Sequence, residues 1–148
     1  MRRKSRTLLW SATVLYVLLL TVVSLLPSGA AAPGGWDSSV SPTVQNLLHV
    51  PAFAVLFWLL TAVWRAMSKG WPTAITVSAL ISLLYGAALE FAQTAIPGRT
   101  GSLDDVLLNT VGVAGAASLA WVLGRPWARI APSRDMADRQ SPPRQESL

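Results

Sequence analysis

The chain has 148 residues, of which 52% are hydrophobic and 13% are charged, and its formal net charge is +5. This composition is more apolar than that of an ordinary soluble domain and predicts an integral membrane protein. The chain has no cysteine and one histidine, which excludes thiolate chemistry, disulfide bonds and multi-histidine metal sites. Because the basic residues flank apolar runs and do not form one aromatic-rich soluble face, we expect no nucleic-acid partner.

Four apolar runs are each about 20 residues long, enough to cross a hydrocarbon core of about 30 Å as a helix. They cover residues 7–26, 47–66, 73–96 and 103–124. Pro27, Gly70 and Pro97 lie between consecutive runs, where helix-breaking residues are expected. The sequence therefore predicts an all-α integral membrane bundle of four transmembrane helices in one domain, residues 1–131. A polar, proline-containing segment, residues 132–148, is expected to be a disordered cytoplasmic tail.

The basic residues indicate how the bundle is oriented. With four crossings, eleven of the 12 lysines and arginines fall on one side of the membrane, and Arg99 falls on the other. The eleven are Arg2, Arg3, Lys4, Arg6, Arg65, Lys69, Arg125, Arg129, Arg134, Arg139 and Arg144. Because lysine and arginine mark the cytoplasmic side, we expect a multi-pass plasma-membrane protein with both termini cytoplasmic.

The first span has a second interpretation as a secretory signal sequence. It begins with basic residues, continues with an apolar run and is followed by Ala30-Ala31-Ala32, which is similar to a cleavage site. However, its apolar run of about 20 residues exceeds the 7–15 that are usual for a signal peptide. We therefore expect the span to be retained, and its cleavage would leave the orientation of the other spans unchanged.

Polar and small residues share one stripe on each of the last two spans. In the third span the stripe contains Gly86, Glu90 and Gln93, and in the fourth it contains Asp105, Asn109, Gly112 and Ala116. A small residue four positions after another lets membrane helices approach closely, so Gly86, Gly112 and Ala116 are expected to pack helices together. The polar residues on the same stripes should then face the interior of the bundle.

Antiparallel spans place the polar residues in one half of the bundle. The expected functional cluster is His49, Glu90, Gln93, Arg99, Asp105 and Asn109. Ionisable groups inside a membrane are costly, and those that are kept there usually serve a function, so we expect Glu90, Arg99 and Asp105 to be electrostatically coupled. A purely structural alternative remains, in which Glu90 pairs with Arg99 and the amides bridge helices. Asp104 is expected to be a solvated acid at a helix start.

Four motifs carry a resemblance to a known family. They are His49 with Phe53, Glu90-x-x-Gln93, Pro97-Gly98-Arg99-x-x-Ser102, and Asp105-x-x-x-Asn109-x-x-Gly112. Together, over residues 45–115, they resemble the VanZ-like family of membrane proteins. The resemblance implies a link to resistance against teicoplanin, a glycopeptide that carries a lipid chain. Many members carry an acidic and a basic residue just before the histidine, where this chain has Gln45 and Asn46.

Two classes of function follow. The first is a non-catalytic envelope protein whose outward polar pocket binds a lipid headgroup or a lipid-bearing antibiotic. The second is a small membrane enzyme that uses Glu90, Asp105 and His49 on a lipid-linked substrate, because a histidine beside carboxylates can act as acid or base. Serine hydrolysis by Ser102 is weaker, since no nucleophile elbow is present.

The expected partner is thus a membrane lipid or an amphiphilic ligand. A carrier of protons or solutes is expected least, because no polar path is apparent in the inner halves of the helices. We assign no catalytic residue, no cofactor and no metal ligand from the sequence, although a carboxylate-assisted site for a hard cation stays open. The sequence does not specify the oligomeric state.

Overall fold

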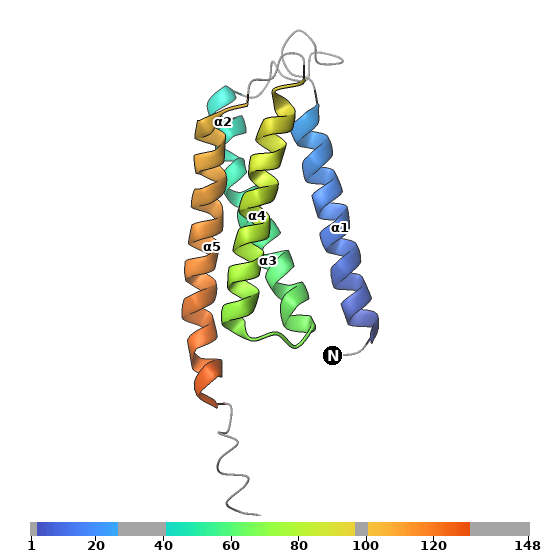
Figure 1. Ribbon diagram of the computed structural model, residues 1–148, viewed down its shortest axis with the longest axis vertical. Helices are drawn as coiled ribbons and strands as arrows, with labels where there is room; N and C mark the ends of the chain where they lie inside the picture. Colours follow the sequence, from blue (N-terminus) through green and yellow to red (C-terminus); the bar gives the residue numbers. More distant parts are fainter. Residues whose placement is uncertain (1–2, 27–40, 97–100, 131–148) are drawn as a thin grey trace, which may run out of the picture.

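In the computed structural model, residues 3–26, 41–96 and 101–130 are described, apart from the side chains of residues 42 and 125–130. These residues form five helices: α1 (Arg3–Leu25), α2 (Pro42–Leu47), α3 (His49–Ala66), α4 (Trp71–Gln93) and α5 (Leu103–Ile130). The four long helices run alternately up and down (Figure 1). We call the end where α1 and α4 finish and α3 and α5 begin the polar end, and the opposite end the basic end.

Four segments are long and apolar enough to cross a membrane: Arg3–Leu25, Thr43–Ala66, Trp71–Gln93 and Leu103–Gly124. This finding confirms the predicted all-α bundle of four transmembrane helices. Many leucines and valines on the outer faces are exposed, among them Leu15, Leu84 and Val122, as expected of side chains that contact lipid. Which end of the bundle faces the cytoplasm stays a prediction, and the expected tail, residues 132–148, lies outside the described residues.

The second span begins earlier than expected, in the short helix α2. Ser41 caps this helix, since its hydroxyl accepts a hydrogen bond from the Val44 N–H at 3.4 Å, and Pro42 occupies the first helical turn. Leu48 joins α2 to α3. Pro51 has no N–H to offer to the Leu47 carbonyl, which accounts for the interruption between the two helices.

The core lies between α3, α4 and α5. Its fully buried members include Phe53, Leu56 and Phe57 of α3, which meet Leu89 of α4 and Val113 of α5. The helix α1 packs on α3 and α4 and makes no comparable contact with α5 within the described part of the chain. The three-helix core therefore positions the site, and α1 is added to its flank.

Hydrogen bonds attach the second half of α1 to its neighbours. The Tyr16 hydroxyl donates to the Ala52 carbonyl of α3 at 2.9 Å. The Tyr85 hydroxyl of α4 donates to the Val17 carbonyl at 3.0 Å and lies 2.8 Å from the Thr21 hydroxyl. These bonds occur where water is scarce, so each satisfies a group that would otherwise be costly to bury.

Glycine allows two close approaches near the polar end. A Cβ at Gly112 would overlap the carbonyl oxygen of Val50, so α5 lies directly against the backbone of α3. A Cβ at Gly86 would lie 2.9 Å from the Phe53 ring and 3.0 Å from the Asn109 amide. Ala116, one turn after Gly112, is buried in the core.

Candidate functional site

Three helices bring a histidine and two carboxylates together at the polar end. His49 is the first residue of α3, Glu90 lies in the last turn of α4, and Asp105 lies in the first turn of α5. One ligand atom from each residue lies within 4.8 Å of the other two. We call these three residues, together with Asn109, the polar cluster.

His49 lies close to polar side chains of both neighbouring helices. Its Nδ1 donates to Asn109 Oδ1 of α5 at 2.9 Å and lies 4.0 Å from Glu90 Oε1 of α4. Its ring is parallel to that of Phe53, with centroids 6.4 Å apart. The imidazole is therefore fixed in orientation, and with 18% of its side chain exposed it is the open side of the cluster.

Glu90 is 5% exposed and is held by the start of α5. Its Oε2 accepts a hydrogen bond from the Ser102 N–H at 3.2 Å. Residue 101, which precedes Ser102, must be glycine or the backbone must shift, because a Cβ at Gly101 would lie 2.6 Å from the Glu90 carbonyl oxygen. The Ser102 hydroxyl accepts from the Asp104 N–H at 3.1 Å and so caps α5, which gives this serine a structural role.

Asp105 differs sharply from its neighbour Asp104. Asp104 is exposed, as expected of a solvated acid at a helix start, whereas Asp105 is 9% exposed. Within the described ranges, the buried Oδ1 of Asp105 has no hydrogen-bond partner. Asn109, one turn later and 2% exposed, binds His49 through its oxygen. The two residues present a carboxylate and an amide from one face of α5.

The other expected members of the cluster stand apart. Gln93 is buried, but its Nε2 donates to the Ser24 carbonyl of α1 at 3.0 Å, so it attaches α1 to α4. Arg99 lies outside the described residues, and its coupling to Glu90 and Asp105 stays a prediction. The structure thus groups four of the six expected residues.

A comparison with family models tests the resemblance. The model described as VanZ/LLP1 matches residues 10–124 of the 148. The chain belongs to the VanZ/LLP1 family. This confirms the resemblance expected from the motifs, and the VanZ/LLP1 match contains the whole polar cluster. Neither the search of curated proteins nor that of solved structures finds a match to the chain.

The sequence interpretation missed buried hydroxyls deeper in this VanZ/LLP1 bundle. Thr61, Ser78 and Ser82 are almost completely buried, and their hydroxyls have no hydrogen-bond partner within the described residues. The expectation that no polar path runs through the inner halves of the helices overlooked these hydroxyls. The signal was available, because Ser78 and Ser82 precede Gly86 and Glu90 at intervals of four residues on one stripe.

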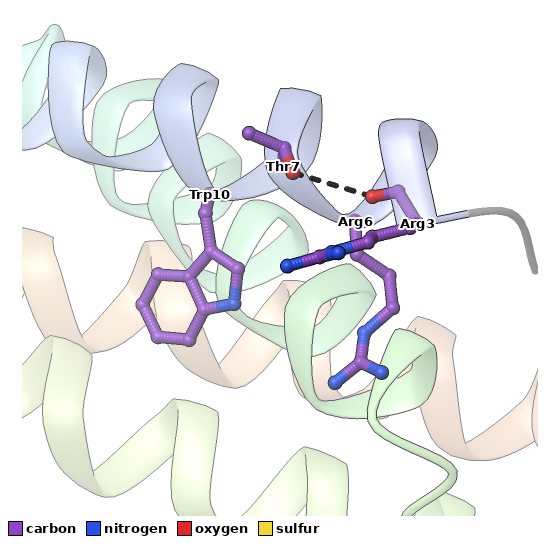
Figure 2. Close-up of a pocket in the computed structure, with 4 residues that line it drawn as sticks. All are labelled: Arg3, Arg6, Thr7 and Trp10. Atoms are coloured by element: carbon purple, nitrogen blue, oxygen red, sulfur yellow. Dashed lines mark hydrogen bonds between the residues drawn. The ribbon is translucent and has the colours of Figure 1, made fainter.

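A second feature lies at the basic end, far along α1 from the cluster. A hollow of about 470 Å³ is lined by Arg3, Arg6, Thr7 and Trp10. Figure 2 shows the two guanidinium groups and the Trp10 indole on one side of the helix, and Thr7 donating to the Arg3 carbonyl. Arginine and tryptophan at a helix end are typical of residues that contact lipid headgroups. We therefore interpret the side chains that line this hollow as anchors of the VanZ/LLP1 bundle at the membrane surface.

The polar cluster combines groups with complementary chemistry. Its carboxylates offer negative charge, its imidazole both donates and accepts hydrogen bonds when neutral, and its amide fixes the imidazole. Charges removed from water interact strongly, and an uncompensated one is costly. The arrangement therefore suits a cationic or hydrogen-bond-donating group that approaches past His49.

Proposed function

We propose that this VanZ/LLP1 protein resides in the plasma membrane with its polar end outward and binds the polar head of an amphiphile at the polar cluster. The observation that carries the proposal is the burial of Glu90 and Asp105 beside the partly open His49. Groups so costly in a membrane usually serve a function. The partition of basic residues supports the outward orientation, since the sequence pattern assigns eleven of the 12 lysines and arginines to the opposite side of the membrane.

The amphiphile we propose is a lipid-bearing glycopeptide such as teicoplanin, so that the protein contributes to resistance against it. The sugar and peptide part would contact the polar cluster, and the acyl chain would remain in the bilayer beside the exposed leucines of the helices. A glycopeptide without a lipid chain lacks this second attachment. Its potency should therefore change less.

The test compares three chains expressed at matched levels in a susceptible host: the wild type, Asp105→Asn and Asp104→Asn. Wild type and Asp104→Asn should raise the inhibitory concentration of teicoplanin more than that of vancomycin, because Asp104 is exposed and outside the cluster. Asp105→Asn should abolish the difference. Equal shifts for both drugs, or none, would contradict the proposed function, and full activity of Asp105→Asn would separate it from the cluster.

The second candidate is a small membrane enzyme that acts on a lipid-linked substrate. It is favoured by the separation of at most 4.8 Å between the ligand atoms of His49, Glu90 and Asp105, close enough for an acid and a base to act on one substrate atom. Glu90→Gln preserves shape and removes the charge. If cells expressing the wild type show a changed lipid profile by mass spectrometry and cells expressing Glu90→Gln do not, catalysis is favoured over binding alone.

A further inference from the structure

We infer that the polar cluster is a binding site for a divalent transition-metal cation, with His49, Glu90 and Asp105 as ligands. The three residues come from three different helices, yet one ligand atom of each lies within 4.8 Å of the others. An imidazole and two carboxylates from distant positions in the chain thus converge as a possible set of metal ligands. This inference goes beyond the proposed binding of an amphiphile and does not depend on it.

Asp105 provides the independent observation. Its side chain is more than nine-tenths buried, and its Oδ1 has no hydrogen-bond donor within the described residues. A buried carboxylate oxygen without a donor is expensive in an apolar medium. Because this oxygen belongs to a residue of the converging set, a cation held between the three side chains supplies the missing partner.

The charges of the cluster also favour a divalent ion. Glu90 and Asp105 carry a formal charge of −2 when ionised, and His49 binds a metal in its neutral form. Among the described residues of the cluster, a divalent cation therefore balances both carboxylates. A single protonated histidine would balance only one of them.

The ligand types indicate the class of metal. Imidazole nitrogen suits Zn²⁺ and other first-row transition ions, and carboxylate oxygen suits Mn²⁺ as well as Zn²⁺. Ligands at about 2.0–2.2 Å from such an ion lie about 3–3.5 Å from their neighbours. The candidate ligand atoms lie within 4.8 Å of one another, so they must approach by up to about 1–2 Å to hold an ion together.

Asn109 has a positioning role in this site. Histidines that bind metals commonly hold a carbonyl or carboxylate with a ring N–H, which fixes the orientation of the ring. The contact of 2.9 Å between the His49 Nδ1–H and Asn109 Oδ1 is of this kind, and it leaves Nε2 as the ring nitrogen that would bind the ion. His49 is the least buried of the three ligands, with 18% of its side chain exposed, so an ion and a water ligand would approach from its side.

The experiment measures cation binding to the purified full-length chain in detergent, after removal of any histidine tag. Equilibrium dialysis against Zn²⁺ and Mn²⁺, with metal counted by mass spectrometry, should give one ion per chain for the wild type. Mn²⁺ bound by the protein should also change its electron paramagnetic resonance spectrum. Asp104→Asn is the matched control and should bind as the wild type does, since it removes an equal charge one residue away but from the exposed side.

Three variants should weaken binding of the cation, the two that remove a ligand more than the one that removes Asn109. Asp105→Asn and Glu90→Gln each remove a ligand charge and should weaken it by more than about 100-fold, and Asn109→Ala should weaken it by about 10- to 100-fold. Circular dichroism and elution volume establish that each variant is folded. If Asp105→Asn does not fold, Asp105→Glu, which keeps the carboxylate, and the rise in wild-type Tm with added Zn²⁺ replace it.

The inference is overturned if the folded wild type binds neither ion at micromolar concentration, or if Asp105→Asn and Asp104→Asn bind equally well. Tighter binding of Mg²⁺ or Ca²⁺ than of Zn²⁺ and Mn²⁺ would overturn the metal class. The outcome is distinct from that of the glycopeptide test. Resistance without cation binding would contradict this inference alone, and cation binding without resistance would contradict the proposed function alone.

Discussion

Gly112 of α5 lies against the backbone of Val50 in α3, and Val50 is the residue that follows His49. The closest approach of the two helices therefore occurs beside the polar cluster. Asn109, three residues before Gly112, can reach His49 because no side chain separates the two backbones at this point. Close packing and the geometry of the site depend on the same glycine.

Gly112→Ala should lower the free energy of unfolding by about 1–3 kcal/mol, because its Cβ overlaps the Val50 carbonyl oxygen and forces α5 away from α3. Gly115→Ala is the control on the same helix, since a Cβ there meets nothing within 4 Å. Unfolding in detergent, followed by circular dichroism, compares the two. Equal loss of stability in both variants would show that helix α5 does not approach α3 as described.

The contact between His49 and Asn109 should be measurable as a coupling energy. A double-mutant cycle of His49→Ala and Asn109→Ala is expected to give about 0.6–2 kcal/mol, the range of hydrogen bonds between membrane helices. The single variants are compared with the double variant by the same unfolding assay. Strictly additive effects would mean that the two side chains do not interact.

Tyr85→Phe should loosen the attachment of α1. The change removes a hydroxyl that donates to the Val17 carbonyl and lies beside the Thr21 hydroxyl. The contact between α1 and α4 should therefore lose about 0.6–2 kcal/mol of stabilising free energy. Limited proteolysis in detergent reports whether α1 becomes more accessible. Thr110→Val serves as the control, since its exposed hydroxyl bonds only within α5, to the Val106 carbonyl, and the variant should behave as the wild type.

The orientation of the bundle is testable in intact cells, because the chain has no cysteine of its own. Single cysteines at positions 37 and 99 should react with a membrane-impermeant thiol reagent, whereas cysteines at positions 69 and 135 should be protected. Cell lysis should make all four reactive, which controls for expression. The reverse pattern would place the polar end in the cytoplasm and contradict the proposed outward site.

The four membrane helices were predictable from the sequence because the length of an apolar run directly reflects the thickness of a bilayer. The convergence of His49, Glu90 and Asp105 was also predictable, since antiparallel helices bring the start of one beside the end of the next. The helix α2 was not anticipated. It is only six residues long, too short to show a hydrophobic period, and its signal is the Ser41-Pro42 cap.

Side-chain direction was the part that the sequence did not reveal. Glu90 and Gln93 share one stripe of α4, yet Glu90 meets the start of α5 while Gln93 donates to Ser24 of α1. A stripe is wide enough to contact two neighbours, and spacing alone does not say which neighbour a long side chain selects. The burial difference between Asp104 and Asp105, in contrast, was predictable, since only Asp105 shares a stripe with Asn109 and Gly112.

The attachment of α1 bears on what the first span is for. Its backbone carbonyls accept hydrogen bonds from Tyr85 and Gln93, two polar side chains of α4 that would otherwise face hydrocarbon. A bundle that had lost α1 would expose both donors to lipid, at a cost of several kcal/mol for each. The first helix thus keeps the side chains of Tyr85 and Gln93 out of contact with lipid. A chain shortened by this helix should be unable to remain a stable monomer in a bilayer, and should recruit a substitute surface from another protein or from a second copy of itself.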